Sequence, residues 1–205
     1  MNASVSQAFE WHYHPDALAM LIVLVGAFLV TSHVLGPRVA PDAPPNARHY
    51  FCYLSGVFAL WLGADWPLHE LAEGYLYSAH MIQHLLFTFI APPLLLLGLP
   101  KWLLRSALDA VGLEGALRAL TRPLVALILF NVTIAVTHWP ALVDASLRSE
   151  PLHFGVHLAL VCTSLLMWWP VVDPLPEMSR LSEPGKMLYL FLQSVLPTVP
   201  ASFLT

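Results

Sequence analysis

A mostly apolar run over residues 76–98 contains no Asp, Glu, Lys or Arg. About 20 such residues in a helix cross the roughly 30 Å hydrocarbon core of a bilayer, so this run predicts a membrane span. Its first turns carry His80 and His84, which lie on one helix face because they are four residues apart. An imidazole in a span is costly without a partner, so this pair is a functional candidate. Pro92 and Pro93 should kink the helix.

The composition indicates several spans rather than one. The chain has 205 residues, of which 58% are hydrophobic and only 11% are charged, whereas a soluble domain carries about 25% charged residues. We expect an all-α polytopic membrane bundle with about six transmembrane helices. The expected spans are 17–35, 50–65, 76–98, 123–139, 152–172 and a last one from residue 187. Residues 1–16 would form a tail, and 17–205 a single transmembrane domain.

Residues 101–120 have the pattern of a helix that lies in the membrane interface. Lys101, Arg105 and Asp109 recur every four residues, and apolar residues occupy the other face. An amphipathic helix of this kind rests on the bilayer surface. The sequence therefore predicts one interfacial helix beside the spans.

The distribution of Lys and Arg predicts the orientation. With the N-terminus outside, only Arg148 falls on an outer segment. The inner segments then hold Arg38, Arg48, Lys101, Arg105, Arg118, Arg122, Arg180 and Lys186. This asymmetry fits the positive-inside rule, so we predict an inner-membrane protein with its N-terminus outside. The lipid bilayer is therefore an expected partner. Nucleic acid is not expected as a partner, because no basic nucleic-acid patch and no nucleotide-binding glycine motif occurs.

Most of the ten histidines fall at the predicted outer end of the spans. A second pair, His153 and His157, opens another inward-running helix, and His138 ends the fourth span on the same side. Neutral imidazole is the commonest metal ligand in proteins, so the five histidines of the two pairs and His138 are candidate metal ligands. The alternative is that they are polar caps at the interface, bonded to their neighbours.

A histidine-rich site suits copper or zinc, and iron if carboxylates join. Asp65 and His69 lie at a similar predicted depth and are candidates to orient the imidazoles. Met81 could offer a thioether to Cu(I), although a methionine in an apolar helix usually serves packing. No nucleophile–base set is apparent, so we expect no catalytic residues and no enzyme activity.

Short motifs stand in order along residues 50–200: SAHMIQHLL at 78–86, APPLL at 91–95, GLP at 98–100, HWP at 138–140, the His153/His157 pair and WWP at 168–170. Together they resemble the polytopic CtaG family of cytochrome c oxidase assembly factors, associated with caa-type oxidases. The resemblance implies a protein that matures a haem-copper oxidase by handling copper on the outer side. It also implies an oxidase subunit as partner, with another copper carrier as a further candidate. Such proteins usually continue into at least one more span.

Three other functions remain open at this point. A haem b electron carrier needs one histidine from each of two facing helices, and spacing of four residues supports only one haem depth. A membrane di-iron hydroxylase also contains H-x-x-x-H boxes, but needs more histidines, on the cytoplasmic side. A scaffold with capped histidines needs no metal, and an oligomer is compatible with each of these functions.

Overall fold

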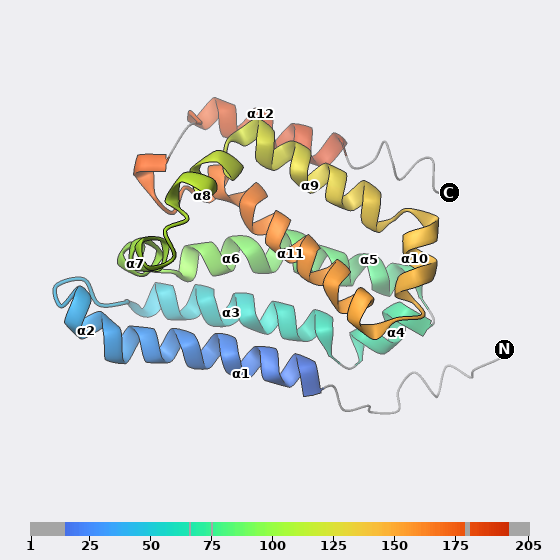
Figure 1. Ribbon diagram of the computed structural model, residues 1–205, viewed down its shortest axis with the longest axis horizontal. Helices are drawn as coiled ribbons and strands as arrows, with labels where there is room; N and C mark the ends of the chain where they lie inside the picture. The colour runs from blue at the N-terminus through green and yellow to red at the C-terminus, as the bar shows by residue number, and fades with distance from the viewer. Residues whose placement is uncertain (1–14, 66, 75, 179–180, 197–205) are drawn as a thin grey trace. The chain divides into compact units, whose positions relative to one another are not determined.

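The computed structural model describes residues 15–65, 67–74, 76–178 and 181–196 (Figure 1). Helices joined by short turns make up these residues, and none of those described lies in a strand, which confirms the all-α prediction. The chain divides into two compact units, Met1–Ala107 and Leu108–Thr205. Of the predicted tail, residues 1–14 lie outside the described residues, and Pro15 already begins the first helix, where its fixed φ is favourable.

The first unit contains most of the N-terminal helices. They are α1 (Pro15–Val30), the π-helical η2 (Thr31–Leu35), α2 (Gly36–Val39), α3 (Ala47–Ala64), α4 (Leu68–Gly74), α5 (Tyr77–Leu85), the π-helical η3 (Leu86–Ile90), α6 (Ala91–Gly98) and the start of α7 (Lys101–Val111). The second unit contains α8 (Glu114–Leu120), α9 (Pro123–Thr137), α10 (Pro140–Ser146), α11 (Glu150–Val172), the 3₁₀-helix η4 (Pro176–Met178) and α12 (Glu183–Val195).

Among the described residues, three helices are long and apolar enough to cross a membrane: Ala17–Val39, Tyr77–Gly98 and Glu150–Val172. The bent pair α8 and α9, whose axes differ by 75°, gives a fourth if it counts as one span. The second and sixth expected spans are present as α3 and α12 but do not pass this length and hydropathy test. α3 is 18 residues long, so a stretch of that length must include the polar residues Arg48 and His49. α12 has only 13 described residues, which is fewer than the 18 required.

In the first unit, α3 packs between α1 and α6, and its backbone approaches α6 closely. A Cβ on Gly98 would lie 2.6 Å from the Cα of Tyr53, and one on Gly56 would lie 3.1 Å from the carbonyl oxygen of Ala91. Small residues of this kind let helices approach in membranes, where dispersion contacts hold them together. On the other side, the rings of Phe28 and Tyr53 stack at 4.1 Å.

The two prolines of the third span do not end its helix. Pro92 and Pro93 stand in the first turn of α6, directly after η3. The N–H of Ala91 donates to the carbonyl of Leu86, five residues earlier. The wider π turn thus carries the helix past the prolines, which lack an N–H of their own.

The interfacial helix predicted over residues 101–120 is interrupted. Gly112 has φ +67°, a left-handed conformation that ends α7, and α8 starts two residues later. The prediction of one helix was wrong in this respect, because the charge pattern on either side of Gly112 does not reveal the break. Arg118 and Glu114 pair at 2.7 Å on α8.

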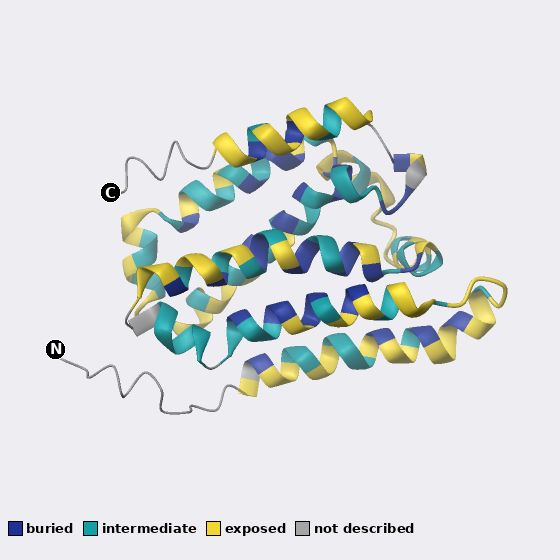
Figure 2. Cartoon of the chain, turned by 180° about the vertical axis from the view of Figure 1, so that it is seen from behind, coloured by how far each residue is buried: buried dark blue, intermediate teal, exposed yellow. Residues whose placement is uncertain are grey.

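The second unit is built from α9, α11 and α12. Phe130 on α9 and Leu160 and Met167 on α11 are fully buried. The Tyr189 hydroxyl on α12 donates to the carbonyl of Met167 at 3.0 Å. Exposed apolar side chains cover much of α12, and the same is true of α1 in the first unit (Figure 2). Such surfaces are expected of helices that face lipid.

Candidate metal centre

The first histidine pair lies on α5, which begins at Tyr77 after an extended Leu76. The ring centroids of His80 and His84 are 4.3 Å apart and their planes are tilted by 54°. Both residues are half-buried. The four-residue spacing therefore brings the two imidazoles together, as predicted, and leaves them accessible from one side.

The second pair repeats this geometry on α11. The ring centroids of His153 and His157 are 4.4 Å apart, with a tilt of 52°, and both residues are again half-buried. Pro151 stands in the first turn of this helix, and the N–H of His153 donates to the carbonyl of Ser149 at 2.9 Å. Each unit thus carries one pair of neighbouring imidazoles near the start of a helix.

His138 ends α9 in a state suited to metal binding. Its Nδ1 donates to the carbonyl oxygen of Ile134 at 2.8 Å. A carbonyl oxygen can only accept, so the proton of the neutral ring sits on Nδ1 and the lone pair on Nε2. Metal-bound histidines usually make this kind of bond with the nitrogen that does not ligate. The short α10 connects His138 to the start of α11, so His138 and the second pair lie at the same end of their unit.

Gln83 lies between the two histidines of the first pair but points into the protein, where it is fully buried. Its Nε2 donates to the carbonyl of Gly63 at 2.7 Å and lies 3.2 Å from Nδ1 of His69. Because the Gly63 carbonyl fixes which end of the amide is the nitrogen, Nδ1 of His69 must accept. The proton of the neutral His69 ring is then on Nε2.

The comparison with known families decides which kind of protein this is. The family model described as "Cytochrome c oxidase caa3 assembly factor (Caa3_CtaG)" matches residues 26–205. The chain belongs to this CtaG family of oxidase assembly factors. No curated protein and no solved structure matches it at a significant level. The resemblance predicted from the motifs is confirmed, and the match includes all five candidate ligands of the assembly factor.

Three other residues were predicted to lie near the site of the assembly factor: Asp65, His69 and Met81. His69 bonds to Gln83, and the carbonyl of Asp65 accepts from the N–H of His69 at 3.2 Å, so these two residues join α3 to α4. Met81 is 41% exposed on α5. A role for any of the three in orienting ligands stays a prediction.

His33 and His49 fall on the inner side in the predicted orientation, and both have structural bonds. Nε2 of His33 lies 3.3 Å from the Tyr50 hydroxyl. His49 forms a capping box with Asn46, in which each side chain bonds the backbone N–H of the other. Partial burial, with a smaller effect of the Arg48 guanidinium, lowers the pKa of His49. Both are therefore suitable as controls when the outer histidines are tested.

Sequence reasoning assigned no role to Gln83. The available signal was a polar residue inside the H-x-x-x-H motif, in a run otherwise rich in apolar side chains. A polar side chain in a span needs a partner, so its burial against another helix could have been anticipated. Its partners, Gly63 and His69, depend on how α3, α4 and α5 pack.

Proposed function

We propose that this assembly factor binds copper at its paired imidazoles and passes it to the oxidase it helps to assemble. The observation that carries the proposal is the pair of matching sites. His80/His84 and His153/His157 have ring separations of 4.3 and 4.4 Å and tilts of 54° and 52°. The spacing of four residues turns both imidazoles of each pair to the same side of its helix, where they can bind one ion together. His138, with its lone pair on Nε2, supplies a fifth candidate ligand.

The donor set agrees with a carrier of copper. Nitrogen ligands of the imidazole type suit copper, and few first-row divalent metals compete with it for such a site. A carrier must also release its metal, which requires ligands that a recipient can replace. The half-buried rings of both pairs meet this requirement better than a closed site would. The predicted recipient is an oxidase subunit on the outer side of the membrane.

Copper binding by the purified protein tests the site. His84→Ala and His157→Ala should each weaken binding by at least about ten-fold, the lower end of what even an outer-shell change costs. His33→Ala, a change at an inner histidine with a structural bond, should leave binding intact. Binding should also weaken in acid, because a protonated imidazole cannot ligate. A Soret band in the purified protein would favour a haem carrier instead.

The double variant His84→Ala, His157→Ala distinguishes one ion from two. If both pairs hold the same ion, the double change should cost less than the sum of the single changes. Additive losses would mean that each pair binds its own ion. Unchanged copper binding in all three variants would contradict the proposal and favour capped histidines.

The role in assembly is tested in cells. A strain without the protein should still make the oxidase subunits and insert haem, but its oxidase should lack copper and be inactive. The variant His80→Ala, His84→Ala should reach the membrane and fail to restore activity. Oxidase with full copper content in the deletion strain would contradict delivery, and full rescue by the variant would remove these two histidines from the mechanism.

A further inference from the structure

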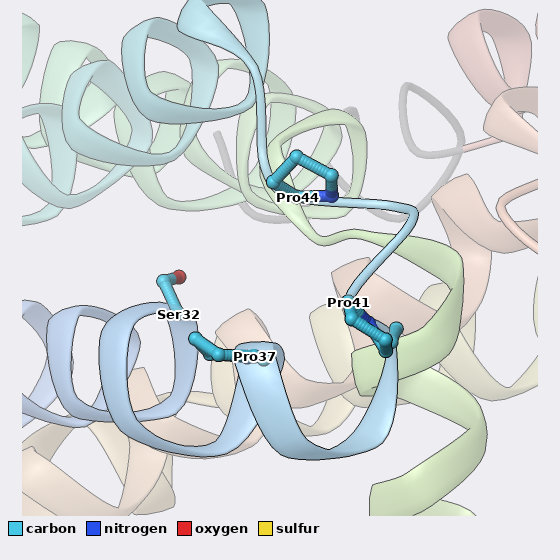
Figure 3. Close-up of a pocket in the computed structure, with 6 residues that line it drawn as sticks. Ser32, Pro37, Pro41 and Pro44 are labelled. Carbon is cyan, nitrogen blue, oxygen red and sulfur yellow. The ribbon is translucent and has the colours of Figure 1, made fainter.

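A cavity of about 140 Å³ lies in the first unit, at the end opposite to the histidine pair along the predicted spans. η2, α2 and the loop that follows them line this partly open cavity (Figure 3). Its lining consists of Ser32, Gly36, Pro37, Ala40, Pro41 and Pro44. None of the proposed copper ligands borders this cavity, so its role is independent of the proposed function.

Ser32 presents a buried hydroxyl to this cavity. The residue is only 5% exposed, and its Oγ has no hydrogen-bond partner. A serine in a helix can bond the carbonyl four residues earlier, but the Phe28 carbonyl accepts from the Thr31 hydroxyl at 3.0 Å and not from Ser32. Figure 3 shows the Ser32 side chain projecting from its helix toward the side of Pro44. A buried donor in this position calls for an acceptor from outside the chain.

The rest of the lining is small and lacks donors. Gly36 has no side chain, and a Cβ there would lie 3.2 Å from the ring of Trp102, which is not itself part of the lining. The three prolines of the lining have no N–H to offer. A ligand in the cavity would therefore meet an apolar wall with one hydroxyl, which suits an ester carbonyl attached to hydrocarbon and does not suit a free hydrated ion.

Exposed basic residues lie close to the lining in sequence. Arg38 stands between Pro37 and Ala40 of the lining, and Arg48 follows Pro44 by four residues. Asp42 is the one acidic residue of the loop. Arg38 lies six residues beyond Ser32, nearer to the predicted inner aqueous side.

We propose that this cavity binds one anionic phospholipid. Its phosphate lies between the guanidinium groups of Arg38 and Arg48, and an ester carbonyl accepts from the Ser32 hydroxyl. The glycerol region packs against the prolines, and the acyl chains follow the exposed apolar side of α1. The predicted orientation places this end of the unit in the cytoplasmic leaflet, whose anionic lipids attract basic segments.

Native mass spectrometry of the full protein in micelles tests the proposal. Phosphatidylglycerol and phosphatidylcholine with identical acyl chains are added in turn. We expect one phosphatidylglycerol to bind at least about ten-fold more tightly than phosphatidylcholine, because both carry the phosphate but the choline ammonium of phosphatidylcholine is repelled by the two guanidinium groups. Ser32→Ala should weaken both lipids by about five-fold, because it removes a neutral hydrogen bond to an ester that both contain. Arg38→Gln with Arg48→Gln should remove the preference for the anionic lipid.

Matched changes elsewhere provide the controls. Ser194→Ala removes a hydroxyl that bonds the Phe191 carbonyl of its own helix, and Arg148→Gln removes a basic residue from the predicted outer side. Both controls should bind lipid as the unchanged protein does. Equal binding of the two lipids, or binding that Ser32→Ala does not alter, would overturn the proposal. Protection against heat by inorganic phosphate alone, lost in Ser32→Ala, would assign the cavity to a free anion instead.

Discussion

Replacing Gln83 by Leu should destabilise the protein far more than the same change at Gln193. Both side chains are fully buried, and leucine has a similar volume, so the two substitutions differ mainly in the hydrogen bonds they remove. Gln83 donates to the Gly63 carbonyl at 2.7 Å and to Nδ1 of His69 at 3.2 Å. Gly63 stands in the last turn of α3, where carbonyls have no partner within the helix.

The expected cost follows from these contacts. Interhelical hydrogen bonds in membranes contribute about 0.6 kcal/mol each on average, and a buried acceptor left without a partner costs about 1–3 kcal/mol. Gln83→Leu removes two bonds and leaves the Gly63 carbonyl without one, but it also removes the Oε1 of Gln83, which is itself buried without a partner. We therefore expect the free energy of unfolding to fall by about 2–3 kcal/mol. This change also removes the hydrogen bond at His69 that links α4 to α5.

Gln193 is the matched control. Its Oε1 accepts one bond from Asn131 Nδ2 at 3.2 Å, and its Nε2 is buried without a partner. After Gln193→Leu, Asn131 Nδ2 still donates to the Leu127 carbonyl at 2.8 Å, and one unsatisfied donor is gone. The expected loss is therefore at most about 1 kcal/mol.

Unfolding of the purified protein by SDS in mixed micelles, followed by circular dichroism, measures both values. The two variants should differ by at least about 1 kcal/mol, which is roughly a five-fold change in the unfolding equilibrium. Equal losses, or a greater loss for Gln193→Leu, would refute the assignment of Gln83 as the bond between α3, α4 and α5.

Two further predictions concern packing and topology. Gly98→Ala should lower the free energy of unfolding by about 2–4 kcal/mol in the same assay, because the new methyl meets the backbone of α3. The control Gly26→Ala, at a glycine with open space around it, should be neutral or stabilising by up to about 1 kcal/mol. A similar loss at both glycines would argue against a close contact between α3 and α6. In a background without the two native cysteines, Glu70→Cys and Arg148→Cys should react with an impermeant thiol reagent in whole cells and Pro44→Cys should not; labelling of Pro44→Cys alone would invert the predicted orientation.

The sequence by itself was sufficient for the helical class and for the two histidine pairs. Both depend on short-range geometry, because a helix returns to the same face every three to four residues wherever it lies. The 4.3 Å between the rings of His80 and His84 follows from this spacing alone. The same is true of His138, whose bond to Ile134 spans four residues, although its tautomer was visible only in the structure.

The tertiary structure decided what each buried polar or small residue meets. Nothing near Gln83 in the sequence indicates that it bonds the end of α3, and nothing near Gly98 indicates that it touches Tyr53, because these partners are 20 and 45 residues away. The cavity beside Ser32 likewise depends on a loop folding back over η2. The periodicity of the sequence indicates which face of a helix is apolar. The neighbour of that face is determined by close packing over the whole unit, because every side chain takes part in it.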